Sequence, residues 1–417
     1  MRRILFLLVL LYATQSYSQQ ISVSADVRMR LEQRDGFGTL SNDTIQPATY
    51  IAQRTRMNIL YKSNHLNLKF APQNYRVWGD VSTVSTSDVG NALHEAYAEV
   101  IFNKKFSLKA GRQEIALDDH RIFGSLDWAM QGRSHDAALL QIAADSLNKI
   151  QIGLAINSNK ESLFRDPYRI SQYKAFQYIW YHGDLTPNFG LSFLFLNNGL
   201  AIKNGNLEEI EYSQTAGPRF LYKNKRLTLD GYAYWQFGKL QSKKLKAANY
   251  ALNLLATLNK QFKVGGGVEY LSGKASNDTD VEFKSFTPLY GTNHKFNGFM
   301  DYFYVGNHAN NVGLIDYNFR IIADINKLNL MLKPHIFNTA ADLVKNGVTQ
   351  NSYLGTEIDF TFSYKMYDYV QWQGGISKMF ASTSMEALKG GDKDGSNYWA
   401  WLAIHINPKL FSQELGK

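Results

Sequence analysis

The stretch Val23–Arg34, VSADVRMRLEQR, alternates apolar and polar side chains. Every odd position from Val23 to Leu31 is apolar, and the even positions carry serine, aspartate, glutamate and arginine. Successive side chains of a β-strand point to opposite faces, so the pattern predicts a strand with one apolar and one charged face. Such a strand needs two different surroundings, one on each side of its sheet.

The same alternation recurs along the chain and predicts about eighteen strands of roughly ten residues, the length of a tilted membrane strand. The predicted strands span 22–34, 50–62, 65–78, 92–102, 106–113, 133–144, 149–158, 173–183, 189–197, 213–222, 227–237, 246–258, 261–272, 313–324, 328–338, 353–364, 369–380 and 397–407.

The connections between these strands alternate between very short and long. The long ones span 35–49, 79–91, 114–132, 159–172, 198–212, 238–245, 273–312, 339–352 and 381–396. Short turns on one rim and long loops on the other are typical of an outer-membrane barrel. We therefore expect an all-β, 18-stranded antiparallel transmembrane β-barrel, with short periplasmic turns, long extracellular loops and periplasmic termini. Phe296–Tyr304 could form a further strand, but it would break the alternation and is assigned to a loop.

The N-terminus and the composition indicate export. Arg2 and Arg3 precede the apolar run Ile4–Ala13, and small residues follow at Ser16 and Ser18. This pattern predicts a signal peptide over 1–18 and a mature barrel over 19–417. The absence of cysteine excludes a disulfide-stapled scaffold. We expect a location in the outer membrane of a Gram-negative bacterium, with membrane lipid and lipopolysaccharide as neighbours and no nucleic-acid partner.

The polar faces of the first strands are rich in arginine. A charged side chain facing lipid at the membrane midplane costs about 2–4 kcal/mol, so we expect these arginines to point into the lumen. Guanidinium groups bind carboxylates and phosphates, and fixed positive charge favours anions in a pore. An alternative is that carboxylates such as Asp26 and Glu32 simply neutralise the arginines. The residues expected to line the pore include Arg28, Arg30, Arg54, Arg56 and Arg76.

Candidate catalytic and metal-binding patterns are weak. In Ser134-His135-Asp136, neighbouring side chains point to opposite faces, so Ser134 and His135 cannot form a catalytic pair. Asp118-Asp119-His120 has no second ligand cluster at a suitable spacing. Asp392–Asp394 begins a calcium-loop pattern that lacks its distal glutamate. We expect no enzyme activity, no cofactor and no resident metal.

Several blocks resemble the alginate export family of outer-membrane porins. They are Leu108–Glu114 (LKAGRQE), Asp119–Ser125 (DHRIFGS), Gly132–Asp136 (GRSHD) and, further on, Phe286–Asp301. The resemblance implies an 18-stranded barrel that passes a polyuronate through an arginine-lined constriction. It implies that Arg112 and Arg133 line this constriction, with Arg54 and Arg56 contributing. Asp136 would be a counter-charge, and Glu95 and Glu357 stand at family positions.

The resemblance also implies that loop 114–132 folds toward the lumen and that 273–312 forms a second gate. The loop residues expected at the constriction are Asp118, Asp119, Arg121, Asp127, His294 and Asp301. The turn Lys365–Asp368 is too short for a long periplasmic gate, and the second half of the chain has few arginines.

These observations favour a passive, monomeric channel for anionic saccharides, polyuronates such as alginate, or other small anionic solutes. A general diffusion porin without saccharide specificity is the main alternative. A barrel enzyme and a structural barrel plugged by its own loops are the others.

Overall fold

The computed structural model describes residues 19–415 except 89, 165, 166, 169–171, 205, 206, 309 and 310. The expected signal peptide lies outside the described residues. The wall strands are β1 Gln19–Asp35, β2 Ala48–Lys62, β3 Leu66–Val77, β4 Asn91–Ile101, β5 Phe106–Gln113, β6 His135–Ala143, β7 Asn148–Ile156, β8 Ala175–Thr186, β9 Phe189–Asn204, β10 Leu207–Lys223, β11 Leu227–Leu240, β12 Lys243–Thr257, β13 Phe262–Leu271, β14 Leu314–Ile325, β15 Leu328–Asn338, β18 Tyr353–Tyr367, β19 Val370–Ala381, β20 Tyr398–Ile406 and β21 Lys409–Leu415.

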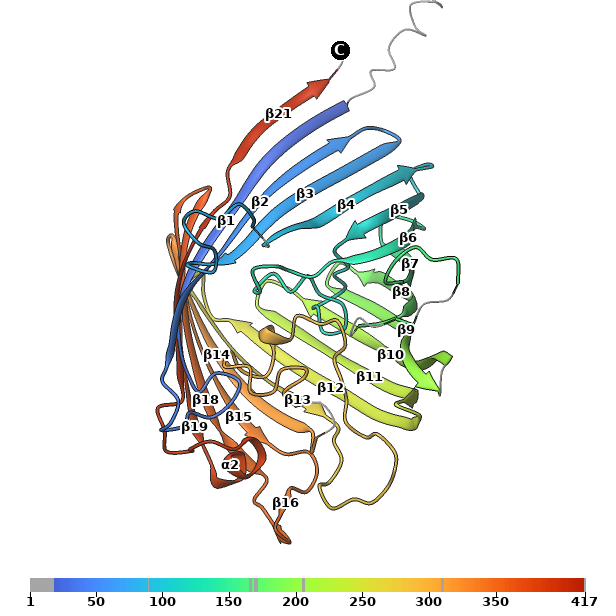
Figure 1. The fold of residues 1–417 in the computed structure, drawn as a ribbon. Helices are drawn as coiled ribbons and strands as arrows, with labels where there is room; N and C mark the ends of the chain where they lie inside the picture. Colours follow the sequence, from blue (N-terminus) through green and yellow to red (C-terminus); the bar gives the residue numbers. More distant parts are fainter. Residues whose placement is uncertain are drawn as a thin grey trace, which may run out of the picture.

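The strands form one closed antiparallel barrel. The sheet has 19 strands, but β20 and β21 are successive parts of a single wall strand, and both pair with β1. Counted as one, they give the 18 wall strands predicted from the alternation, and the pairing of β1 with β2 on one side and with β20 and β21 on the other closes the barrel. Both ends of the wall lie at one rim, while α2 (Thr383–Lys389) and the small β16–β17 hairpin (Val344–Lys345 and Val348–Thr349) lie at the other (Figure 1).

The two faces of the wall differ as the alternation predicts. Met57 and Phe70 are 46% and 48% exposed on the outside, where they meet lipid. Arg54 and Arg56, on the same hairpin, are 0% and 6% exposed on the inside. Among the described residues, no helix combines the length and the apolar character needed to cross a membrane.

Two predicted long loops are in fact hairpins. Most of 198–212 continues β9 and β10, and 238–245 contains the tight turn between β11 and β12, where Gln241 and Ser242 have φ of 52° and 63°. Both hairpins lie at the rim that carries the long loops, where strands leave the hydrocarbon layer and no longer need an apolar outer face. Apolar alternation therefore fades before the strands end, and the strict short/long rule has these two exceptions.

Two long segments fold into the barrel and occupy much of its interior (Figure 1). The first inward loop, 114–134, connects β5 and β6; the second, 272–313, connects β13 and β14 and contains the 3₁₀ turn Asn293–Lys295. Within the second loop Phe296–Tyr304 forms no strand, as expected. Phe123 and Tyr290 join the two loops through a parallel β-bridge. Their rings pack on Phe176 and Tyr178 of the wall, so the loops share an aromatic core with the barrel.

Candidate functional site

The arginine-rich wall of β1 and β2 holds the first inward loop. Arg28 donates from Nη2 to Asp127 Oδ2 at 2.9 Å, and Arg54 donates from Nη1 to Asp127 Oδ1 at 2.8 Å. Arg54 also donates from Nη2 to Asp26 Oδ2 at 2.6 Å. Burial alone would raise the pKa of Asp127, but the charges of Arg28 and Arg54 outweigh it and hold that pKa below its usual value. Asp127 thus fastens the loop to two neighbouring strands.

A second contact lies beside it on β1. Arg30 donates from Nε to Glu32 Oε1 and from Nη1 to the carbonyl oxygen of Trp128, both at 2.8 Å. Its guanidinium lies 3.9 Å from the centre of the Trp128 ring, in cation–π geometry. Arg34 also pairs with Glu32, at 2.8 Å. The inward arginines of β1 are therefore largely neutralised by carboxylates, in line with the alternative reading of this wall.

Two further arginines tie the inward loops together. Arg121 is 1% exposed, pairs with Glu269 at 2.6 Å and donates to Asn297 Oδ1 at 3.1 Å. Arg133 donates from Nη1 to the carbonyl oxygens of Gly291, at 2.8 Å, and Tyr290. Arg133 lies before β6 and not on it, so its expected position on a wall strand is wrong. The two loops therefore behave as one connected insert.

The structure places Arg76, Arg112 and Asp136 on the outer face of the wall, which corrects their expected position in the pore. Arg112 alternates in phase with the exposed Leu108 and pairs across the strands with Asp136, at 2.9 Å. The side chains of this pair are 43% and 61% exposed. Arg76 alternates in phase with the exposed Phe70. All three stand at the loop-side ends of their strands, where a charge on the outer face costs only about 0–1 kcal/mol.

The predicted carboxylates Glu95 and Glu357 do face inward, and each has a partner. Glu95 contacts Lys69 and accepts from the backbone N–H of Glu114 at 3.2 Å. Glu357 is 0% exposed and accepts from the backbone N–H of Met300 at 2.8 Å. Both carboxylates thus hold inward loops against the wall.

The remaining loop residues that the sequence singled out also lie inside the barrel. Trp180 of the wall donates to Asp118 Oδ2 at 3.0 Å. His294 hydrogen-bonds Asp301 at 2.9 Å, and its ring stacks on that of Trp128 at 4.4 Å between centres. This stack joins the first inward loop to the second.

One group of potential metal ligands occurs among the described residues. Ligand atoms of His94, Glu95 and Glu114 lie within 4.8 Å of one another. Lys69 already pairs with Glu95, and Arg56 lies 4.0 Å from Glu114. His94 Nε2 is hydrogen-bonded to Glu114 at 2.7 Å. These ion pairs and hydrogen bonds engage all three side chains of the group.

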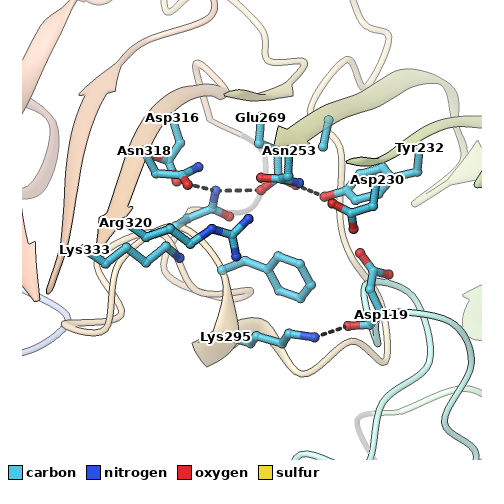
Figure 2. Close-up of a pocket in the computed structure, with 13 residues that line it drawn as sticks. Asp119, Asp230, Tyr232, Asn253, Glu269, Lys295, Asp316, Asn318, Arg320 and Lys333 are labelled. Atoms are coloured by element: carbon cyan, nitrogen blue, oxygen red, sulfur yellow. Dashed lines mark hydrogen bonds between the residues drawn. The ribbon is translucent and has the colours of Figure 1, made fainter. Parts of the chain in front are cut away.

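A cavity of about 160 Å³ lies between the second inward loop and the wall strands β11–β15 (Figure 2). Its carboxylates have basic or histidine partners: Glu269 pairs with Arg121, Asp230 with Arg219 at 3.2 Å, and Asp316 with His335 at 2.8 Å. Asp119 lies 3.9 Å from Arg219, and burial raises the pKa of Asp119.

Three cations that line this cavity take no part in the ion pairs just described: Lys295, Arg320 and Lys333. Lys295 donates to the carbonyl oxygen of Asp119 at 2.9 Å, while the side chains of Arg320 and Lys333 point into the same space (Figure 2). Within the described part of the chain, none of the three has a carboxylate oxygen within 4.0 Å, and Arg320 Nε is buried without a hydrogen-bond partner. We call this group the basic cluster. The density of arginine in the sequence does not indicate Lys333, but the phase of Lys333 with the inward His335 on β15 does.

A second cavity, of about 320 Å³, lies nearer the loop-side rim and is lined by Arg30, Arg34, Tyr50, Trp128 and Tyr304 among others. Both cavities are bounded by both inward loops: His294 faces the second cavity, and its neighbour Lys295 faces the first. Adjacent residues of the second inward loop therefore line two cavities, an outer, aromatic one and an inner, basic one.

Comparisons with known proteins agree with this architecture. The alginate export family model matches residues 19–155, which supports the resemblance over that part of the chain. No curated protein matches the sequence. The fold is similar to OccAB4 of Acinetobacter baumannii, with a TM-score of 0.63 at 13% identity over 95% of this chain and 100% of that one. OpdL and OccK3 (OpdO) of Pseudomonas aeruginosa give TM-scores of 0.62 and 0.61, each at 14% identity over 94% of this chain and 99% and 96% of theirs.

The closed barrel and its exposed apolar outer face have the architecture of an outer-membrane β-barrel, and the family match over residues 19–155 agrees with a location in the Gram-negative outer membrane. The low identity to the solved porins means that their likeness concerns the fold.

Proposed function

We propose that this barrel is a passive channel for anionic solutes, above all anionic saccharides such as polyuronate oligomers. The observation that carries the proposal is the basic cluster. Arg320 and Lys333 project into the lumen cavity, and no carboxylate of a described residue lies within 4.0 Å of either, so their charge is available to a solute. A ring or cluster of fixed positive charge in a narrow pore favours anions.

The arginines of β1 and β2 have a different role in this account. Most of these arginines form ion pairs with Asp26, Glu32 or Asp127. The arginines therefore shape the pore by holding the first inward loop. The cations that attract an anion are then Arg320 and Lys333, which lie on β14 and β15, on another part of the wall. The outer cavity adds aromatic faces at Tyr50 and Trp128, against which the apolar face of a sugar ring packs.

The carboxylates around the basic cluster help the solute to leave the channel. A channel must bind its solute strongly enough to admit it and weakly enough to let it leave. Asp230, Glu269 and Asp316 line the same cavity as Arg320 and Lys333 and moderate the grip of these cations on an anion.

Current block tests the proposal. The purified protein is inserted in a planar bilayer, and the current is recorded with added polyuronate oligomers or with neutral dextrins of equal length. We expect block by the polyuronate, and a block constant about tenfold weaker in the double variant Arg320→Gln, Lys333→Gln, which is less than the full loss of two charge-assisted contacts because water screens both cations. The variant Lys225→Gln, Arg226→Gln removes the same charge from an exposed turn and should change little.

Equal block by neutral dextrins would instead support a general diffusion porin. A barrel plugged by its own loops is a further candidate, because ion pairs tie the inward loops to the wall. A complete lack of current, persisting after deletion of the inward loops, would favour it over the channel.

A further inference from the structure

A shallow, open groove runs along the outer face of β2, β3 and β4, outside the pore. Its upper part, about 570 Å³, lies at the loop-side rim and is lined by Gln53, Arg76, Trp78, Asp80 and Asp88 among others. Its lower part, about 630 Å³, is lined by Met57, Phe70, Pro72 and Leu93. The two parts share Thr55, Asn74 and Asn91, so they form one continuous surface.

A β-bulge creates the hollow in the lower part. The register between β3 and β4 shifts at Ala71 and Pro72, where Pro72 has no N–H to give to the ladder. His94 and Glu95 are consequently both buried, at 3% and 4% exposed. The next side chain on the outer face after Leu93 is the small Ala96, which leaves the surface open there.

The lower part belongs to the lipid-facing belt. Met57 and Phe70 are 46% and 48% exposed, and Phe70 alternates in phase with Leu68, which is 41% exposed. A shallow apolar depression in this position suits a hydrocarbon chain, since its apolar lining offers van der Waals contacts along the length of the chain.

The upper part is polar, and hydrogen bonds and an ion pair join its side chains. Trp78, 54% exposed, donates from its indole nitrogen to Gln53 Oε1 at 2.9 Å. Arg76 donates to Asn74 Oδ1 at 2.8 Å and pairs with Asp88. With Asp80 also present, this region has no excess of positive charge. Amide, carboxylate and guanidinium groups around an exposed indole match the hydroxyl groups and apolar face of a sugar better than a phosphate.

We propose that this groove binds one outer-leaflet glycolipid, with its sugar against Trp78 and Arg76 and an acyl chain along Met57, Phe70 and Pro72. The juxtaposition of a sugar-like polar rim and an apolar hollow, continuous through Thr55 and Asn74, favours an amphiphile of this kind. Arg76, which the sequence predicted to line the pore, contacts the sugar on the outer face of the barrel in this proposal. The inference does not depend on what passes through the channel.

Native mass spectrometry of the intact protein in detergent tests the inference. The probe is an acylated glucosamine disaccharide, in dephosphorylated and phosphorylated forms. The comparators are phosphatidylglycerol and the unacylated disaccharide. We expect one high-occupancy adduct with either glycolipid form, and only weak adducts with both comparators. Trp78→Ala should weaken the glycolipid adduct about tenfold, as expected for the loss of a packed aromatic contact. Met57→Ala should weaken it by a smaller factor.

Trp235→Ala is the matched control, because Trp235 is 45% exposed on the outer face of β11, away from the groove. It should leave the adduct unchanged. Equal occupancy by phosphatidylglycerol, or equal loss in Trp235→Ala, would overturn the proposal in favour of general annular lipid. Binding of the phosphorylated form alone would also overturn it, because the recognised group would then be phosphate. Resistance of each folded variant to SDS at room temperature establishes that the barrel is intact.

Discussion

Asp127→Asn should release the first inward loop and enlarge the channel. The substitution keeps the shape of the side chain but removes the charge that accepts from Arg28 at 2.9 Å and from Arg54 at 2.8 Å. Arg54 keeps Asp26 as a partner, whereas Arg28 retains only its bond to the carbonyl oxygen of residue 127, at 2.7 Å. Two charge-assisted hydrogen bonds contribute about 1.5–3 kcal/mol each when they are fully formed.

The side chain of Asp127 is 51% exposed, so solvent screening reduces that figure. We expect a loss of about 2 kcal/mol in the docking free energy of the loop, or roughly a thirtyfold rise in the undocked population. The wall pairs through its own ladder, and the barrel itself should remain folded.

Single-channel recording is the assay. Asp127→Asn should show a larger mean conductance and more frequent transitions than the wild type, and the first inward loop should become sensitive to protease. Asp136→Asn is the matched control, since the same chemical change is made on the outer face. Unchanged conductance and protease resistance in Asp127→Asn would refute the view that Asp127 fastens the loop. So would an equal effect of Asp136→Asn.

Three further predictions concern the same elements. Arg112→Ala should leave ion selectivity within experimental error of the wild type, because Arg112 faces outward; a clear loss of anion preference would restore it to the pore. The lowered pKa of Asp127 means that its contribution to loop docking is complete above the ordinary aspartate pKa of about 3.9 and is lost as the pH falls through the lower folded value. Conductance should therefore be constant from neutral pH to about pH 5 and rise only in stronger acid, whereas Asp127→Asn should lack this rise; an equal acid response in both proteins would contradict it. Phe123→Ala removes a 0% exposed ring shared by both inward loops and the wall and should cost about 3–5 kcal/mol of local packing, seen as faster hydrogen exchange in 114–134 with β-sheet circular dichroism retained. Exchange unchanged there would contradict the shared aromatic core.

The sequence predicted the barrel well because lipid imposes one simple rule on every wall residue. Alternation in Val23–Arg34 places Arg28 and Arg30 inside, where they are 8% and 4% exposed. That rule weakens at the rim, where no hydrocarbon penalises charge. Arg76, Arg112 and Asp136 were misplaced there, although the phase of Arg112 with Leu108 could have corrected it. The 198–212 and 238–245 hairpins were missed for the same reason.

The interior was harder to predict, because it depends on contacts between distant segments. Family resemblance implied that 114–132 folds inward, but periodicity could not show that Asp127 meets Arg28 and Arg54. It also could not show that Glu269 and Asn297 enclose Arg121. Whether Arg320 and Lys333 have a carboxylate partner among the described residues depends on where all the neighbouring carboxylates lie in space, which periodicity does not give. The dense charges of the first strands thus indicated where ion pairs form. The cations that remain available to a solute, Arg320 and Lys333, lie on β14 and β15.

The most direct test of the central claim is the reversal potential of the channel in a planar bilayer with a salt gradient. The wild type should show a reversal potential of the sign set by anions, and Arg320→Gln, Lys333→Gln should move it toward zero, while Lys225→Gln, Arg226→Gln should not. A reversal potential of the sign set by cations in the wild type, or one that the Arg320 and Lys333 substitutions leave unchanged, would contradict the account.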